Sequence, residues 1–377
     1  MEITMPFNAL PLISTIYVEE SKELLRLAED TRVALSVLDY AVKRLPNDAI
    51  VLDNLLLQEA KCSSAVENIV TTNDELYKGL SLSKMTPAVK EVASYKEGLF
   101  LGYTNMQAKA NLLSISDIIA INATFNNREQ GLRKNLPGLA SSLTRIASVA
   151  ASGEQTILYT PPHGLDLLNR LMMDLLEFIY DDERFSLHPL IKIALAHYQF
   201  ECIHPFHDGN GRTGRILNIL FLCNKGYLSK PYLYASAFII KNKNEYYALL
   251  NDTTKSKQYD EVVKYMLTCF CQTAQETLAL VEEITALYQQ YTSGGFLKGL
   301  GGNKENLRTA IRLAFVKTYI RTKDLEDAGM HRQTASAILN SLVQAGFLQV
   351  EQQVGNSKQA KIYKNMDLLN LFGGKEQ

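Results

Sequence analysis

The chain has 377 residues, of which 46% are hydrophobic and 21% charged, and its 39 Lys and Arg balance 40 Asp and Glu to a formal net charge of −1. This is the composition of a globular protein long enough for two or three domains, and it excludes a disordered chain, a collagen and a dense disulfide scaffold. The near-neutral balance argues against nucleic-acid binding over the whole surface, although it allows a local basic patch.

The helical regions predicted by the hydrophobic periodicity make the chain mainly α. A capping-box pattern, Thr72 followed by Glu75, predicts the start of one further helix. Between residues 131 and 162 the helical pattern lapses, and the run 154–159, which ends at two prolines, predicts an extended segment or hairpin arm. The other predicted helices cover residues 24–38, 50–68, 95–104, 165–180, 189–202, 213–224, 245–250 and 265–291.

The C-terminal part begins after a glycine-rich stretch, residues 293–302, which predicts a hinge and a domain boundary. Helices over 308–320, from Thr322 and over 331–344, followed by strands at 347–351 and 361–363, are typical of a winged helix. We therefore expect four parts: an N-terminal helical region (1–85), a catalytic core (86–275), a helical connector with the hinge (276–303) and a winged-helix domain (304–377).

Five cysteines occur without a C-x-x-C pair, which favours buried, reduced thiols and a cytoplasmic protein. The N-terminal residues MEITMPFNALPL lack the basic region, apolar run and cleavage site of a signal peptide. The apolar stretches are shorter than a membrane span, so we expect no membrane partner.

One stretch carries the ingredients of phosphoryl-type chemistry: residues 204–215 read HPFHDGNGRTGR. Pro205 disfavours helix at His204, so a helix ends there and a glycine-rich turn leads into the next one. Such a turn presents backbone N–H groups and the positive end of a helix dipole to an anion. Arg212 and Arg215 lie on one helix face and can hold phosphate oxygens, Asp208 suits Mg²⁺, and His204 suits a general base.

This stretch resembles the signature H-P-F-x-D-G-N-G-R-x-x-R of the Fic family at all nine specified positions, and the resemblance extends over about residues 63–247. It implies an all-helical core that transfers AMP from ATP to a Ser, Thr or Tyr hydroxyl. In the family pattern, His204 is the base, Asp208 holds Mg²⁺, and the nucleotide phosphates bind Gly209, Asn210, Gly211, Arg212 and Arg215. The segment Thr156, Ile157, Leu158 and Tyr159 resembles the flap that docks the target by strand addition, and Tyr246 and Tyr247 match a pair lining the base side.

Other interpretations of single residues remain open. Phe206 falls in the nucleotide-binding motif but has the character of a core residue. His207 occupies the variable position and is expected in solvent, and His197 is expected to be structural. A zinc site built from His204, His207 and Asp208 is disfavoured by the adjoining glycines and arginines.

A second motif lies upstream, where residues 63–68 read SSAVEN. It resembles the family's inhibitory pattern [S/T]-x-x-x-E-[G/N], with Ser63, Glu67 and Asn68 at the specified positions. The resemblance implies that Glu67 pairs with Arg215, takes the place of the γ-phosphate and leaves bound ATP in an unproductive arrangement. Some relatives use this glutamate to position water and remove AMP, so a de-AMPylating hydrolase is an alternative.

The charge of the C-terminal part suggests a possible DNA partner. From Lys304 to Lys364 the sequence has 10 Lys and Arg against 5 Asp and Glu, and the third C-terminal helix begins with His331, Arg332, Gln333 and Thr334. A DNA-binding regulator with a Fic sensor core is therefore a second hypothesis, and transfer of UMP or another group is a third. We therefore expect an autoinhibited protein adenylyltransferase that uses ATP and Mg²⁺. Self-modification and a homodimer are left open.

Overall fold

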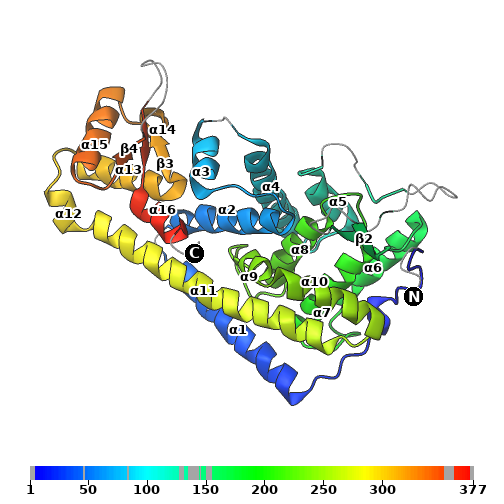
Figure 1. Ribbon diagram of the computed structural model, residues 1–377. Coiled ribbons are helices and arrows are strands. Elements are labelled where there is room, and N and C mark those ends of the chain that lie inside the picture. The colour runs from blue at the N-terminus through cyan, green and yellow to red at the C-terminus, as the bar shows by residue number, and fades with distance from the viewer. Residues whose placement is uncertain are drawn as a thin grey trace. The chain divides into compact units, whose positions relative to one another are not determined.

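The computed structural model describes residues 5–45, 47–82, 85–126, 131–134, 144, 146–149, 155–351 and 361–373. It confirms the predicted mainly helical fold with a short hairpin and a small C-terminal sheet (Figure 1). Its elements are η1 (Ile13–Thr15), α1 (Lys22–Lys43), α2 (Ala49–Val66), α3 (Asn73–Leu82), α4 (Pro87–Ala108), α5 (Ile115–Ala123), β1 (Ile146–Val149), β2 (Gln155–Tyr159), α6 (Leu165–Tyr180), α7 (Pro189–Ile203), α8 (Asn210–Asn224), α9 (Ser236–Lys241), α10 (Lys243–Ser256), α11 (Asp260–Thr292), α12 (Gly294–Lys298), α13 (Lys304–Lys317), β3 (Tyr319–Arg321), α14 (Thr322–Asp327), α15 (Arg332–Gln344), β4 (Gln349–Val350), β5 (Ile362–Lys364) and α16 (Met366–Gly373).

The chain divides into two compact units. The first comprises Met1–Asp39, Cys62–Asn68 and Ser94–Gln275, and the second comprises Tyr40–Lys61, Ile69–Ala93 and Glu276–Gln377. By this division the last residues of α2 belong to the first unit. The two motifs found in the sequence therefore fall in the same unit.

Helix α7 forms the centre of the first unit, where it packs against both α6 and α8. Nearly all of its side chains are buried, which explains why its sequence is apolar on every face. It begins at Pro189, in the first helical position that proline favours, and ends at His204, which adopts a left-handed conformation with φ 49°. Pro205 disfavours a right-handed helical conformation at His204, which agrees with the end of α7 there, although the left-handed conformation itself is not the extended one that proline usually favours.

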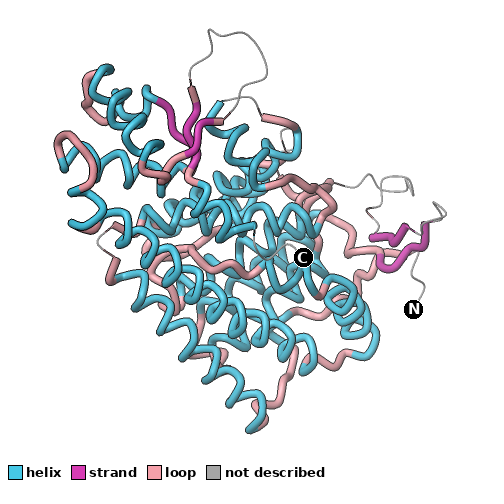
Figure 2. The backbone as a smooth tube through the Cα atoms, turned by 60° about the vertical axis from the view of Figure 1, so that its left-hand side comes forward, coloured by secondary structure: helices cyan, strands magenta, loops and turns pink. Residues whose placement is uncertain are grey.

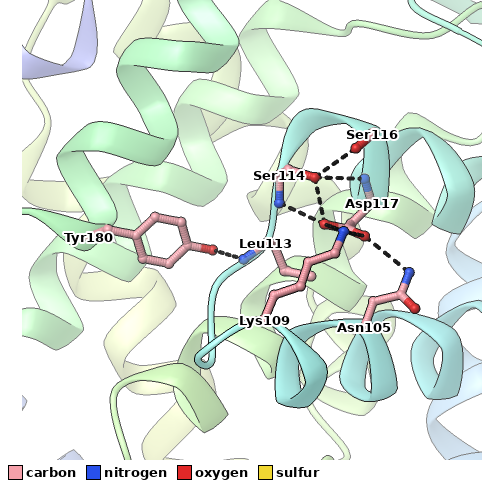
Figure 3. A network of polar contacts seen from close by, with 7 residues as sticks. All are labelled: Asn105, Lys109, Leu113, Ser114, Ser116, Asp117 and Tyr180. Atoms are coloured by element: carbon pink, nitrogen blue, oxygen red, sulfur yellow. Dashed lines mark hydrogen bonds and ion pairs between the residues drawn. The ribbon is translucent and has the colours of Figure 1, made fainter.

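Helix α5 is fixed at its start by a buried carboxylate (Figure 3). Ser114 and Asp117 form a reciprocal capping box, and Lys109 donates to both oxygens of Asp117 at 2.7 and 2.9 Å. The hydroxyl of Tyr180 on α6 accepts a hydrogen bond from the backbone N–H of Leu113 at 2.8 Å. Because α5 is anchored in this way, its last turn is held in position beside the loop that follows α7.

Strands β1 and β2 form the predicted hairpin, an antiparallel pair visible as the isolated two-stranded element in Figure 2. Ile146 is aligned with Tyr159 and Ala147 with Ile157, so the register shifts by one residue between them. The side chains of Thr156 and Leu158 lie outside the described residues. The hairpin is anchored at the end of β2, where the Tyr159 hydroxyl donates to the Cys202 carbonyl at 2.9 Å.

The second unit contains a three-stranded antiparallel sheet of order β3-β5-β4, with α13, α14 and α15 preceding its last two strands. The predicted helix over 308–320 is wrong at its end: α13 stops at Lys317, Thr318 has φ 62°, and Tyr319–Arg321 is a strand. Pairing with β5 across the sheet overrides the helical pattern there. The predicted hinge also contains a helix, α12, which the Ser293 side chain caps by accepting from Phe296 N.

In the part of the chain that the structure describes, none of the helices combines the length and the apolar character needed to cross a bilayer.

Candidate active site

His204 stands at the C-terminal end of α7, braced by Arg133 from a distant part of the sequence. The Arg133 guanidinium is 1% exposed and donates to three backbone carbonyls, those of His204 at 2.7 Å, Ile203 at 3.2 Å and Pro162. These bonds satisfy carbonyls that the end of a helix leaves without internal partners. Burial, and after it the charge of Arg133, lowers the pKa of His204 to about 4. The imidazole is therefore neutral at pH 7, the state that a general base requires.

The loop from Phe206 to Asn210 is held by side chains that bond to its own backbone. Asn210 accepts from the Phe206 N–H and donates to the Phe206 carbonyl, both at 2.8 Å, so both ends of its amide group are used inside the loop. Asn122 of α5 donates to the Asp208 carbonyl at 2.9 Å. Gly209, with φ 76°, is the N-cap of α8 in a conformation that favours glycine. The loop is thus preformed, and it directs the N-terminus of α8 toward the pocket.

Phe206 and the polar side chains beside it point in different directions. Phe206 is 1% exposed and packs near Phe200, as its core character suggested. His207 is exposed, and the Asp208 side chain is 75% exposed with Oδ2 3.7 Å from Arg212 Nη2. Among the described residues, no three His, Cys, Asp or Glu side chains gather as a metal site. A single accessible carboxylate beside a phosphate-binding helix end fits Mg²⁺, which takes its other oxygens from water and substrate.

Arg215 of α8 holds the end of α2. Its Nε donates to the Ser63 hydroxyl at 2.8 Å, and its Nη2 donates to the Ser63 carbonyl at 2.9 Å and to Glu67 Oε1 at 2.8 Å. The Arg215 side chain is 2% exposed and that of Glu67 is 33% exposed. The structure therefore brings together the two residues that the inhibitory pattern pairs, although they lie 148 positions apart in the sequence.

Glu67 occupies space that exists because residue 211 has no side chain. A Cβ added at Gly211 would lie 2.3 Å from Glu67 Oε1 and 2.9 Å from Arg215 Nη1. Burial alone would raise the pKa of Glu67, but the charge and hydrogen bond of Arg215 outweigh it, and the pKa lies below 4.5. Glu67 is therefore a carboxylate at neutral pH, lying over the first turn of α8 where an anion is favoured.

Asn68 follows the end of α2 and adopts the left-handed conformation, with φ 63°. Gly and Asn are the residues that tolerate this conformation at a helix end, which gives a physical reason for the G/N choice in the pattern. Its Oδ1 accepts from Lys243 Nζ at 2.8 Å.

Tyr246 and Tyr247 of α10 are held by different contacts. Tyr246 is 2% exposed, and its hydroxyl lies 2.9 Å from His197 Nε2, while His197 Nδ1 lies 3.1 Å from Asn218 Nδ2. Burial lowers the pKa of His197 to about 3, so this histidine is a neutral structural residue, as expected. The His197–Asn218 pair fixes Tyr246, and the Tyr247 ring packs against it with the centroids 5.1 Å apart.

These groups surround one pocket, whose empty space, including the part open to solvent, is about 790 Å³. The C-terminal end of α7, the start of α8, the end of α2, the hairpin and α10 all contribute to its wall. The lining residues are Glu67, Ile146, Tyr159, Glu201, Cys202, His204, Gly211, Arg215, Tyr246, Tyr247, Leu250, Asn251 and Thr254.

Three sequence comparisons cover most of this molecule. The Fic/DOC family matches residues 112–222, which include the whole motif at 204–215, and the Fic/DOC family N-terminal region matches residues 25–104, which include residues 63–68. The domain described as protein adenylyltransferase SoFic-like, C-terminal domain, matches residues 307–368. The chain belongs to the Fic/DOC family.

Named relatives of the Fic domain are distant and longer. Protein adenylyltransferase Fic of Drosophila grimshawi is 32% identical over 146 residues, which are 38% of this chain and 29% of the relative. The corresponding protein of Drosophila mojavensis is 44% identical over 66 residues, or 18% of this chain and 13% of the relative. The chain thus spans less than a third of the length of these curated relatives.

Solved structures show the same fold at low identity. A Fic family protein from Desulfovibrio desulfuricans G20 has a TM-score of 0.56 and 19% identity, over 93% of this chain and 98% of that one. Fic-1 (residues 134–508) from C. elegans has a TM-score of 0.52 and 17% identity, over 69% of this chain and 74% of that one.

Within the Fic domain, the sequence motifs miss three residues that shape the site: Arg133, Asn122 and Glu201. Arg133 and Asn122 act by bonding to the backbone of the loop, and Glu201 lines the pocket. Only Glu201 gave a local signal, since it lies one helical turn before His204.

In the SoFic-like domain, the predicted recognition helix is α15. His331 is its N-cap and accepts from the Gln333 N–H through Nδ1, while Arg332, Gln333 and Thr334 are exposed in its first turn. DNA binding by this turn stays a prediction.

Proposed function

We propose that this Fic-family protein transfers AMP from ATP to a hydroxyl of a protein side chain, and that Glu67 inhibits the transfer. The observation that carries the proposal is the shared pocket, in which a neutral His204, the start of α8 and the Glu67–Arg215 ion pair face the same space. The names of the relatives and of the C-terminal domain support the adenylyl group as the one transferred. The division into four parts given above is proposed with it.

The residues act as follows in the uninhibited state. His204 accepts the proton of the target hydroxyl while its oxygen attacks the α-phosphorus, and the bond to the leaving pyrophosphate breaks. The backbone N–H groups at the start of α8, with Arg212 and Arg215, bind the phosphate oxygens. Asp208 would hold Mg²⁺, which neutralises phosphate charge when it is bound. Tyr246 and Tyr247 border the base, and β2 offers an edge on which the target backbone adds.

Inhibition follows from the position of one carboxylate. Glu67 uses the Arg215 guanidinium that the outer phosphate would otherwise bind, and it lies where a side chain at Gly211 would be. The Glu67 carboxylate and the outer phosphate are both negative and would repel each other at the same place. The triphosphate therefore binds in a different arrangement, and the α-phosphorus is not in line for attack. Displacement of the end of α2 restores the productive site.

Hydrolytic removal of AMP is the second candidate function. The observation that favours it is that Glu67, an ionised carboxylate, lines the same pocket as His204. A carboxylate in that place can orient a water molecule toward an AMP-modified side chain. This activity requires Glu67, whereas AMP transfer is opposed by it.

The test is transfer of labelled AMP from Mg²⁺–ATP to the protein itself and to a lysate of its host, for the native chain, Glu67→Gly and Glu67→Gly/His204→Ala. Loss of a charge-assisted pair predicts at least a roughly tenfold rise in Glu67→Gly. Loss of the general base predicts a fall of about 10² to 10⁴-fold from that level. A folded Glu67→Gly protein that labels neither itself nor the lysate contradicts AMP transfer.

The same variants decide between the two activities when the substrate is a pre-labelled protein. Release of AMP by the native chain that is lost in Glu67→Gly supports the hydrolase. Release that is equal in both proteins contradicts a role for Glu67 in hydrolysis.

A further inference from the structure

Glu201 is a carboxyl group in the pocket that the proposed mechanism does not use. It lies on the last turn of α7, three residues before His204, and it lines the same cavity as Glu67 and Arg215. Its Oε1 is buried and has no hydrogen-bond partner among the described residues. A buried polar atom without a partner is costly, so its position at a ligand pocket calls for a ligand that completes it.

The fold makes room for this carboxyl group. A Cβ added at Gly214 of α8 would lie 2.4 Å from Glu201 Oε1 and 3.1 Å from Phe200 Cδ1. The two glutamates therefore lie over two glycines one turn apart on α8, Glu67 over Gly211 and Glu201 over Gly214. Of the two glutamates, Glu67 is the one that accepts a hydrogen bond from Arg215, which lies next to Gly214 in the sequence.

If both carboxyl groups were ionised, they would repel each other and would also repel a phosphate that binds beside Arg215. Glu67 has the hydrogen bond of Arg215 and is ionised, so the proton falls to Glu201. Burial raises the pKa of Glu201 to about 7, with Arg215 lowering it and Glu67 raising it further. Glu201 thus changes charge near neutral pH.

The other ionisable groups that line the pocket keep their charge state between pH 6 and 8.5. His204 is already neutral above about pH 4, and Glu67 is ionised. Burial alone would lower the pKa of Arg215, but Glu67 together with Tyr246, Tyr247 and Glu201 outweighs it, so Arg215 remains a cation. Burial raises the pKa of the remaining groups, to about 11 for the Cys202 thiol and above the ordinary value of 10 for the phenols of Tyr159, Tyr246 and Tyr247.

Resting on the proposed use of ATP, we propose that Glu201 is a nucleotide-binding residue that acts as a neutral acid, donating a hydrogen bond from its carboxyl group to a phosphate oxygen held beside Arg215. The bond satisfies the unpartnered carboxyl group and adds no negative charge to the site. An ionised Glu201 accepts only, so it would repel the same oxygen. Nucleotide binding and protonation of Glu201 are therefore linked, and each favours the other.

The linkage has two measurable consequences. With a pKa near 7, most Glu201 is protonated at pH 6 and ionised at pH 8.5, so nucleotide affinity falls at least roughly tenfold between these values. Binding at pH 8 takes up close to one proton per site. Both consequences are measured by calorimetry with α,β-methylene-ATP and Mg²⁺, a nucleotide that cannot donate AMP, in buffers of different ionisation enthalpy.

The Glu67→Gly chain is the reference, since its Arg215 is free of the Glu67 carboxylate. Loss of that charge lowers the pKa of Glu201, so the measurements are extended to pH 5, and the fall in affinity toward pH 8.5 is still expected. Adding Glu201→Gln keeps a donor and removes the titration, so affinity at pH 8.5 is expected to match that at pH 6 within about twofold and the proton uptake to disappear. Adding Glu201→Leu removes both the donor and the negative charge, so affinity falls below that of the reference at pH 6 and no longer depends on pH. Thermal unfolding of each variant establishes that it is folded.

Two results overturn the inference in distinguishable ways. If Glu67→Gly and Glu67→Gly/Glu201→Gln bind with the same pH dependence and the same proton uptake, Glu201 is not the titrating contact, while the proposed function stands. If none of the folded variants, nor the native chain, binds the nucleotide at either pH, the proposed use of ATP fails and the inference fails with it.

Discussion

The motif loop after α7 and the residues at the end of α2 meet in one pocket but are held there in different ways. The loop is fixed by bonds from Arg133, Asn122 and Asn210 to its backbone, and these reach it from three parts of the sequence. The end of α2 is held to α8 through Arg215, and Asn68 just after α2 accepts a hydrogen bond from Lys243 of α10. The loop contacts are made to backbone groups, so they position the loop whether or not a ligand is bound, whereas the Glu67 contact uses the Arg215 guanidinium that a phosphate could also bind. This difference suits the proposed inhibition, in which the site is preformed and Glu67 blocks it.

The largest effect is expected from removing Arg133, which holds the end of α7 and the start of the loop. Arg133→Met removes the guanidinium that bonds to the carbonyls of Ile203 and His204. In the Glu67→Gly background we expect kcat for AMP transfer to fall about 100-fold, because small displacements of a catalytic group cost this much. The KM for ATP is expected to change little, since Arg133 does not line the pocket.

The matched control for the loop is Arg184→Met, which removes an exposed arginine paired with Glu177. It is expected to leave kcat unchanged. A folded Arg133→Met enzyme with the kcat of its parent would show that the loop does not depend on this brace.

A smaller effect is expected at the end of α2, where Ser63 bonds to Arg215 and the neighbouring Ser64 provides a control. Ser63→Ala removes the acceptor of Arg215 Nε, which is worth about 1 kcal/mol, and AMP transfer by the otherwise native chain should rise roughly fivefold. Ser64 is also buried, but its hydroxyl has no hydrogen-bond partner among the described residues. Ser64→Ala should therefore leave transfer unchanged, and equal rates in the two variants would contradict a specific contact at Ser63.

The smallest expected effect is that of pH on inhibition. Because the pKa of Glu67 is depressed, its ion pair with Arg215 is complete above pH 4.5 and is lost only as pH falls through the depressed value. The ratio of AMP transfer by Glu67→Gly to that by the native chain, at saturating ATP, is therefore expected to stay constant from pH 5.5 to 8. A ratio that collapses toward one at pH 6 would mean that Glu67 is protonated far more easily than its contacts imply.

Local patterns and the family resemblance predict much of this molecule, and their limits have physical causes. The motif at 204–215 is contiguous, so its turn, its helix start and the end of the preceding helix at His204 follow from Pro205 and the glycines, whereas the left-handed conformation of His204 does not. The pairing of Glu67 with Arg215 follows only from the resemblance, because local physics does not connect residues 148 positions apart.

What the sequence could not provide depends on tertiary neighbours. Arg133 belongs to no predicted helix or motif. Its role is visible only in the folded protein, where it bonds to the carbonyls of another segment. The strand β3 was assigned to a helix because its partner β5 is more than forty residues away in the sequence. Glu201 was visible beside the motif, but a carboxyl group shows its altered acidity only once its burial is known.

The space above Gly211 has a consequence for genetics. The same absent side chain admits Glu67 and, in the proposed reaction, the phosphates, so substituting Gly211 would remove the inhibition and the activity together. A selection for hyperactive mutants should therefore recover few changes in the catalytic motif. Gain-of-function alleles are expected to cluster on the last turns of α2, at codons 63 and 67, where inhibition can be lost while the chemistry is spared.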